Sequence, residues 1–226
     1  MIAEATSLLA ALQFGDGQFP GGAFAFSWGV ESLVADGRLA RRDWFSFLLG
    51  QMEGRWAGFD RPLIAHAHAA ARDGAVLAAL DDLAEALTLS AAARAGARRA
   101  GAALLGTHAR LGTEGAAAYR AKVSAGQTPG HLPVVQGLVL AGVGLDRMSA
   151  LAVSAHSTAQ SLGSAAIRLG LISAQDSQSA LQALRPHLAM FLAANIPAPD
   201  EIGSFAPLAD IAMMRHPLQL QQLFAN

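Results

Sequence analysis

The stretch SAAARAGARRAGAALLGTHARL, residues 90–111, decides the fold class predicted for this chain. Alanine, leucine and arginine are strong helix formers, and a serine directly before such a run is a favoured N-cap. The whole chain of 226 residues has the same bias, with 51 Ala and 32 Leu against only 9 Val, 7 Ile and 6 Thr. Because strands favour β-branched residues, this composition excludes an all-β fold. It predicts an all-α, single-domain bundle of roughly eight to ten helices over residues 1–226.

Start and stop signals divide the remaining sequence into further helices. Ser27, Ser90 and Asp146 are expected N-caps, Ser173 with Asp176 forms a capping-box pattern, and Pro62 suits the first turn of a helix opened by Asp60. Alanine and glycine recur inside these segments, which indicates closely packed helices. The expected helices cover residues 5–14, 27–36, 43–56, 60–73, 75–89, 90–111, 114–123, 133–143, 146–169 and 173–195, and a final amphipathic stretch covers 207–224.

Charge and hydropathy narrow the class of protein. Apolar residues make up 53% of the chain and charged residues 15%, with a net charge of −1, which excludes disorder. The longest apolar run, residues 132–145, is too short to span a bilayer. Residues 1–4 do not open a secretory signal, so we expect a cytoplasmic protein. The apolar surplus then predicts an interface with a partner or a second copy.

Motifs for catalysis are weak. Residues 25–29 differ by one position from the G-x-S-x-G pattern that exposes a nucleophilic serine on a strand-to-helix turn. No strand is predicted there, and N-capping explains Ser27 without catalysis; a serine hydrolase stays the least favoured alternative. His66 and His68 are two residues apart, so on a helix they point in different directions and cannot chelate one ion together. The sequence therefore predicts no bound metal and no cofactor.

Positive charge is concentrated in residues 88–122, which contain six basic residues and one acidic residue, Glu114. Arg94 and Arg98 are four positions apart and share a helix face, with Arg99 beside them. This basic face could dock an acidic protein surface, or it could simply be a solvated helix face. Nucleic acid is a poorer fit, because only Tyr119 is an aromatic neighbour and the pI is about 6.6.

The last residues carry an apolar stripe. Leu220, Leu223 and Phe224 fall at i, i+3 and i+4 and would share one face of a helix. Chain ends usually fray unless they dock onto something. The stripe therefore predicts either a partner-docking segment at about residues 204–226 or a cover for this chain's own core.

Five blocks of sequence together resemble the UreF family of urease accessory proteins. The opening block has the order L-L-A…Q…F-P-G-G-x-F-x-F-S-x-G-x-E and ends at Glu31. Further matching blocks are residues 94–105, 131–137, 164–170 and 204–224. The blocks stand in the family's order and span nearly the whole chain.

The resemblance implies an all-α protein without catalysis of its own. It implies binding to a UreD/UreH-type accessory protein, recruitment or regulation of a UreG-type GTPase, nickel delivery to apo-urease, and a homodimer. An adaptor of the same fold with another client is the alternative. This chain has Phe26 where the family has tyrosine, and it lacks the arginines that commonly flank the closing Leu-Phe. The closing-block residues implied to bind a partner are Arg215, His216, Leu220, Leu223 and Phe224. The opening-block residues Phe24, Phe26, Ser27 and Glu31 are implied either to bind a partner or to have a structural role.

Overall fold

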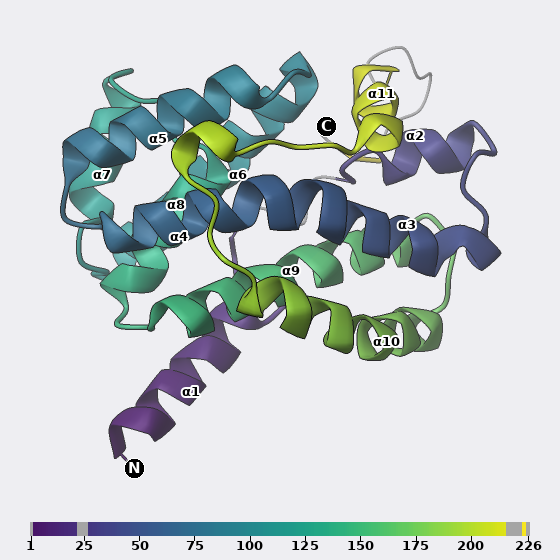
Figure 1. Ribbon diagram of the computed structural model, residues 1–226, viewed down its shortest axis with the longest axis horizontal. Helices are drawn as coiled ribbons and strands as arrows, with labels where there is room; N and C mark the ends of the chain where they lie inside the picture. Colours follow the sequence, from purple (N-terminus) through teal and green to yellow (C-terminus); the bar gives the residue numbers. More distant parts are fainter. Residues whose placement is uncertain (1, 22–26, 216–222, 225–226) are drawn as a thin grey trace.

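The computed structural model describes residues 2–21, 27–215 and 223–224, and this part of the chain is helical without any strand. The all-α prediction is confirmed. Because α3 and α4 belong to one continuous helix, the described residues form ten helices, arranged as in Figure 1. The elements are α1 (Ile2–Gly15), α2 (Val30–Ala35), α3 (Trp44–Gln51), α4 (Arg61–Ala69), α5 (Gly74–Leu87), α6 (Ala91–Arg110), α7 (Ala116–Ser124), α8 (Leu132–Gly142), α9 (Arg147–Arg168), α10 (Ala174–Ala193) and α11 (Pro207–Arg215).

Three predicted helix starts are confirmed by their hydrogen bonds. The Ser90 hydroxyl accepts from the N–H of Ala93 at 3.3 Å, and the Asp146 carboxylate accepts from the N–H of Ser149 at 2.9 Å. Ser173 and Asp176 form a reciprocal capping box at the start of α10. These caps satisfy backbone N–H groups that have no partner inside the helix.

α4 begins at Arg61 with Pro62 in its first turn, as predicted, but no break in the helix precedes it. A 3₁₀ turn (Arg41–Asp43), α3, a π-helical segment (Met52–Asp60) and α4 run into one another without a break. Pro62 has no N–H to donate to the carbonyl of Gly58, four residues earlier. That carbonyl instead accepts from the backbone N–H of Gly203 at 3.2 Å, so the helix continues through the proline.

The core lies on both sides of this long helix. One cluster of buried apolar residues joins α4, α5, α6 and α8, and the other joins α2, α3, α9 and α10 around Trp44, Phe47 and Trp56. The predicted close packing is confirmed where α8 crosses α4: a Cβ added to Gly137 would lie 2.5 Å from the Ile64 carbonyl oxygen. Trp56 also donates to the Ser154 hydroxyl on α9 at 3.1 Å.

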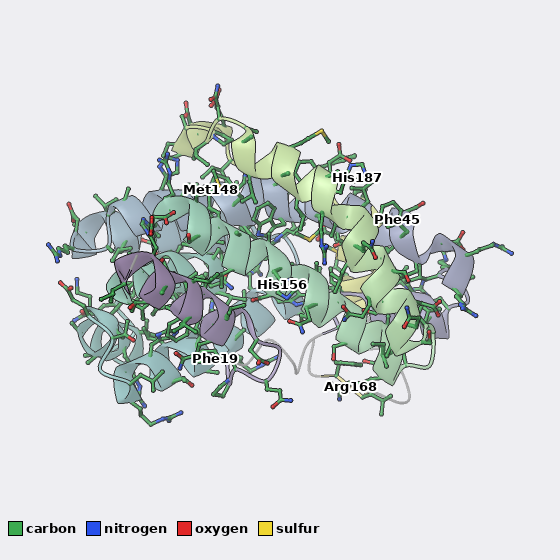
Figure 2. All side chains as sticks on the ribbon, turned by 90° about the horizontal axis from the view of Figure 1, so that it is seen from below. Phe19, Phe45, Met148, His156, Arg168 and His187 are labelled. Carbon is green, nitrogen blue, oxygen red and sulfur yellow. The ribbon has the colours of Figure 1, made fainter. Side chains whose placement is uncertain are left out.

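The first helix, α1, forms an outer part of the molecule. α1 projects away from the bundle in Figure 1. Phe14 at its inner end packs against Phe19 and His108, and Figure 2 labels Phe19 beside this end of the helix. None of the helices in the described ranges combines the length and the apolar character that crossing a membrane requires.

Candidate protein-docking site

The opening and closing blocks of the sequence meet in space, because α2 and α11 pack against each other (Figure 1). Gly29 precedes α2 with a φ of 88°, and a Cβ there would lie 2.9 Å from the Ala209 carbonyl oxygen on α11. At the other end of the contact, Arg215 forms an ion pair with Asp36 at 2.9 Å. Residues that are far apart in the sequence therefore build one composite site.

Ser27 supports the start of α2 rather than any chemistry. The helix begins at Val30, three residues later than predicted, because Gly29 takes a left-handed conformation that breaks the helix before it. The Ser27 hydroxyl still accepts from the N–H of Glu31 at 3.3 Å. Ser27 is fully buried. Its place at the start of α2 therefore explains Ser27 without catalysis.

Glu31 holds the described end of the chain. Its carboxylate accepts from the N–H of Leu223 at 2.5 Å and from the N–H of Phe224 at 3.3 Å. The Phe224 ring is buried, with the Arg168 guanidinium 4.3 Å from its centroid. Phe224 thus packs onto its own chain, as the own-core alternative for the tail predicted, while Leu223 remains 66% exposed.

The structure does not describe four of the predicted site residues. Phe24, Phe26, His216 and Leu220 lie outside the described residues. The apolar face proposed for residues 220–224 is therefore represented only by its last two members. Of these, Leu223 alone points outward.

A row of exposed apolar side chains lies on and just before α11. α11 is nine residues long and turns Ala209, Ala212 and Met213 inward. Its opposite side is apolar as well, because positions i, i+3 and i+6 of this short helix share one outward face. We call this surface the α11 face; its members are Phe205 (81% exposed), Leu208 (46%), Ile211 (54%) and Met214 (47%). The spacing of residues 208, 211 and 214 was a signal that the sequence analysis missed, since it concentrated on residues 220–224.

A second exposed apolar surface lies on α1. Leu8, Leu9 and Leu12 are each more than 60% exposed, and Ile2 continues the surface toward the tip of the helix. Glu4 is the only charged residue in α1. Contiguous apolar surface of this kind usually marks an interaction site.

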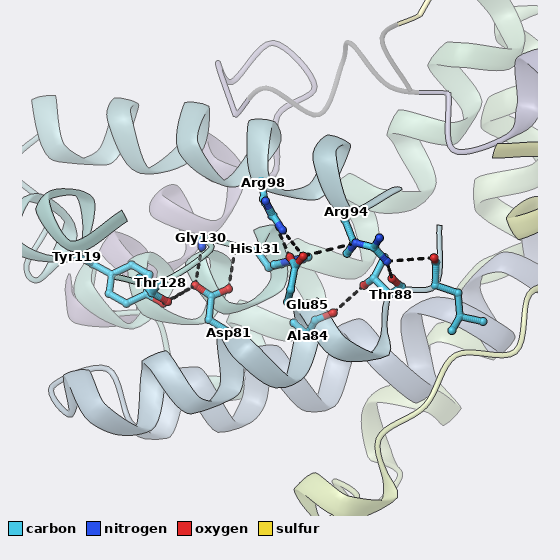
Figure 3. Close-up of polar contacts among 11 residues, drawn as sticks. Asp81, Ala84, Glu85, Thr88, Arg94, Arg98, Tyr119, Thr128, Gly130 and His131 are labelled. Atoms are coloured by element: carbon cyan, nitrogen blue, oxygen red, sulfur yellow. Dashed lines mark hydrogen bonds and ion pairs between the residues drawn. The ribbon is translucent and has the colours of Figure 1, made fainter. Parts of the chain in front are cut away.

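The predicted basic face is largely compensated within the chain. Arg94 and Arg98 both form ion pairs with Glu85 on α5, and Arg94 also donates to the Thr88 carbonyl at 2.7 Å (Figure 3). Burial raises the pKa of Glu85, but hydrogen bonds from Arg98 and His131 outweigh burial and hold that pKa below its ordinary value. Glu85 was not included in the predicted basic segment because it lies just outside residues 88–122. Arg99 is exposed on the same helix.

Asp81, one turn before Glu85, anchors the loop between α7 and α8 (Figure 3). Its buried carboxylate accepts from the hydroxyls of Tyr119 (2.8 Å) and Thr128 (2.7 Å). It also accepts from the backbone N–H groups of Gly130 (2.6 Å) and His131 (2.7 Å). Four donors satisfy the buried charge, so this carboxylate has a structural role.

The two neighbouring histidines also have structural roles. The Nε2 atom of His66 lies 2.8 Å from the Pro197 carbonyl oxygen, and that of His68 lies 2.8 Å from the Leu145 carbonyl oxygen. As predicted from their spacing, they face different neighbours. Within the described part of the chain, no three His, Asp or Glu side chains come together in a way that could hold a metal ion.

Comparison with known proteins agrees with the resemblance found in the sequence. The UreF family model matches residues 40–185. The chain belongs to the UreF family. It is 34% identical to the urease accessory protein UreF of Cereibacter sphaeroides strain KD131, over 96% of this chain and 98% of that protein. It is 31% identical to the UreF of Rhizobium leguminosarum bv. viciae, over 92% of this chain and 91% of that protein, and 30% identical to that of Trichodesmium erythraeum, over 96% of each.

The UreF relatives are named as accessory proteins of urease and not as enzymes, which agrees with the expectation of a non-enzyme. The family model leaves out α2 and α11, the two helices of the composite site. The full-length relatives align across both helices.

Proposed function

We propose that this UreF-family chain is an adaptor in urease maturation. It binds a UreD/UreH-type accessory protein and recruits or regulates a UreG-type GTPase, and the assembly serves nickel insertion into apo-urease in the cytoplasm. The observation that carries the proposal is the α11 face: apolar side chains left exposed on and just before α11, the closing-block helix that packs against α2.

The α11 face has the character of an interface centre. Each apolar side chain of this size contributes about 1.5–3 kcal/mol when it moves from water into a packed contact. Three such side chains lie on α11, and Phe205 comes two residues before the helix begins. The Arg215–Asp36 ion pair supplies charge beside them, which matches the usual arrangement of an apolar centre with a polar rim. We assign this face to the UreD/UreH-type partner.

The exposed leucines of α1 support self-association as a homodimer. α1 projects at the lower left of Figure 1 and α11 lies at the upper right, so both contacts can form at once. We assign the exposed Arg99 on α6 to contact with the GTPase.

Co-purification tests the assignment of the α11 face. Ile211→Asp places a charge at its centre and is expected to abolish co-purification with the UreD/UreH-type accessory protein. Leu111→Asp is the matched control, because Leu111 is equally exposed (55%) but follows α6 elsewhere on the surface. Both variants should keep the thermal midpoint of the parent. Retention of the partner by Ile211→Asp would show that the face is not the docking site.

A further inference from the structure

Residues 194–206 form a strap that runs from the end of α10 across the long helix to α11 (Figure 1). One 3₁₀ turn, Pro199–Glu201, is its only regular structure. The strap is the covalent route by which the α11 face is attached to the bundle. Its contacts with the long helix are therefore relevant to where that face lies.

The strap is bonded to the π-helical segment through backbone atoms. The N–H of Phe205 donates to the Gly54 carbonyl at 2.7 Å, and the N–H of Gly203 donates to the Gly58 carbonyl at 3.2 Å. π-Helical turns are rare and concentrate at functional sites. Here the segment offers two carbonyl groups, four residues apart, to a chain that crosses it.

Both carbonyl groups belong to glycines because a side chain would not fit. A Cβ on Gly54 would overlap the carbonyl oxygen of Phe205, and a Cβ on Gly58 would lie 2.7 Å from the carbonyl oxygen of Gly203. In each case the obstructing atom is backbone, which cannot turn aside as a side chain can. Pro62 adds to the arrangement, because it cannot donate to the Gly58 carbonyl.

Arg61 fixes the other end of the strap. Its guanidinium donates to the carbonyls of Ala194 and Asn195, both at 2.8 Å, and to Ala57 at 3.2 Å. Arg61 is 4% exposed, and burial lowers its pKa. A buried cation with three carbonyl acceptors ties the beginning of the strap to the same helix. His66 adds a contact with Pro197 at 2.8 Å.

We propose that Gly54, Gly58 and Arg61 are positioning residues that set the location of the α11 face. A nine-residue helix is marginal by itself, and α11 turns only small or flexible side chains, Ala209, Ala212 and Met213, toward the bundle. α11 also packs on α2 through the close approach at Gly29 and the Arg215–Asp36 ion pair, and the register of the strap on the π-helical segment fixes where this short helix begins. The positioning itself concerns this chain alone; its consequence for partner binding rests on the proposed function.

A distance measurement tests the positioning directly. The chain has no cysteine, so Gln178→Cys on α10 and Met214→Cys on α11 accept a pair of spin labels without interference. In this background, Gly54→Ala is expected to shift and broaden the label-to-label distance distribution. Gly50→Ala is the matched control on the same helix, because a Cβ there meets nothing within 4 Å; it should leave the distribution unchanged. An unchanged distribution in Gly54→Ala, or an equal shift in Gly50→Ala, would overturn the proposal.

Partner binding separates the positioning from the proposed function. With the unlabelled full chain and the purified UreD/UreH-type protein of the same source, Gly54→Ala should weaken binding at least about tenfold. Gly50→Ala should bind as the parent does. A shifted distance with undiminished binding would support the positioning and would show instead that the partner does not dock on the α11 face.

The wild-type protein provides a measurement that does not depend on any variant folding. Amide hydrogen exchange by NMR should show the N–H groups of Gly203 and Phe205 protected, because both are bonded to the long helix. Arg61→Lys, which keeps the charge but loses the forked geometry, should raise the exchange rates at residues 203 and 205. Exchange at the unprotected rate in the wild-type protein would refute the strap contact.

Discussion

The carboxylate of Glu31 on α2 accepts a hydrogen bond from the backbone N–H of Phe224, 193 positions further along the chain, at 3.3 Å. The Phe224 ring lies against Arg168 at the end of α9. The opening block of the sequence thus holds the closing block in place through one buried carboxylate. The two blocks form one site, and Phe224 is its internal anchor rather than its contact surface.

Replacing Phe224 by alanine should destabilise the protein, whereas replacing Leu223 by alanine should have little effect. Phe224→Ala removes a buried ring and is expected to lower the free energy of unfolding by about 2–3 kcal/mol. Leu223→Ala removes an exposed side chain and should change it by less than about 0.5 kcal/mol. Urea denaturation followed by circular dichroism measures both. Equal effects would contradict the different burial of the two side chains.

Asp81 should be intolerant of even an isosteric change. Asp81→Asn replaces one carboxylate oxygen by an amide that faces N–H and O–H donors, and we expect a loss of at least about 2 kcal/mol in the free energy of unfolding. Asp82→Asn is the control, because Asp82 is exposed on the next position of α5. Both can be compared in chemical denaturation. A cost for Asp82→Asn as large as that for Asp81→Asn would argue against the four-donor anchor.

His108 should make stability depend on pH. Burial lowers its pKa from 6.5 to about 4. Between these values the unfolded chain binds the proton and the folded chain does not, so stability falls as pH drops through this range, by up to about 3 kcal/mol. Denaturation midpoints between pH 7 and pH 4 measure the effect.

Two variants separate the titration of His108 from its packing. His108→Asn should lose this part of the pH dependence. Thr113→Val removes the hydrogen-bond partner 2.9 Å from Nδ1 but keeps the imidazole. It should therefore lower stability while retaining the pH dependence. A parallel pH profile for wild type and His108→Asn would show that the buried imidazole does not titrate as described.

Gly137 should be required for the crossing of α8 over α4. In Gly137→Ala the new methyl group would lie 2.5 Å from the Ile64 carbonyl and 2.6 Å from Ala67 Cβ. The helices would have to separate, and we expect a loss of about 1–3 kcal/mol. Gly50→Ala, with open space around the new methyl group, should instead stabilise by about 0.5–1 kcal/mol. Thermal unfolding of the two variants gives the comparison.

The sequence by itself determined the features that depend on local chemistry. The fold class followed from a composition rich in alanine and leucine, because helix formation depends on backbone hydrogen bonds within one segment. The caps at Ser90, Asp146 and Ser173 were predictable, because each depends on a side chain within three residues of the group it satisfies. The family could also be read from the order of the sequence blocks.

Only the tertiary structure decided the features that depend on distant atoms. The helix continues through Pro62 because Gly203 satisfies the Gly58 carbonyl from outside it. The positive charge of Arg98 on α6 is paired with Glu85 on α5. Phe224 is buried because Glu31 accepts a hydrogen bond from its N–H and Arg168 packs against its ring. Whether a side chain is exposed to a partner depends on which distant residues pack against it in the folded chain. A local sequence pattern does not contain that information.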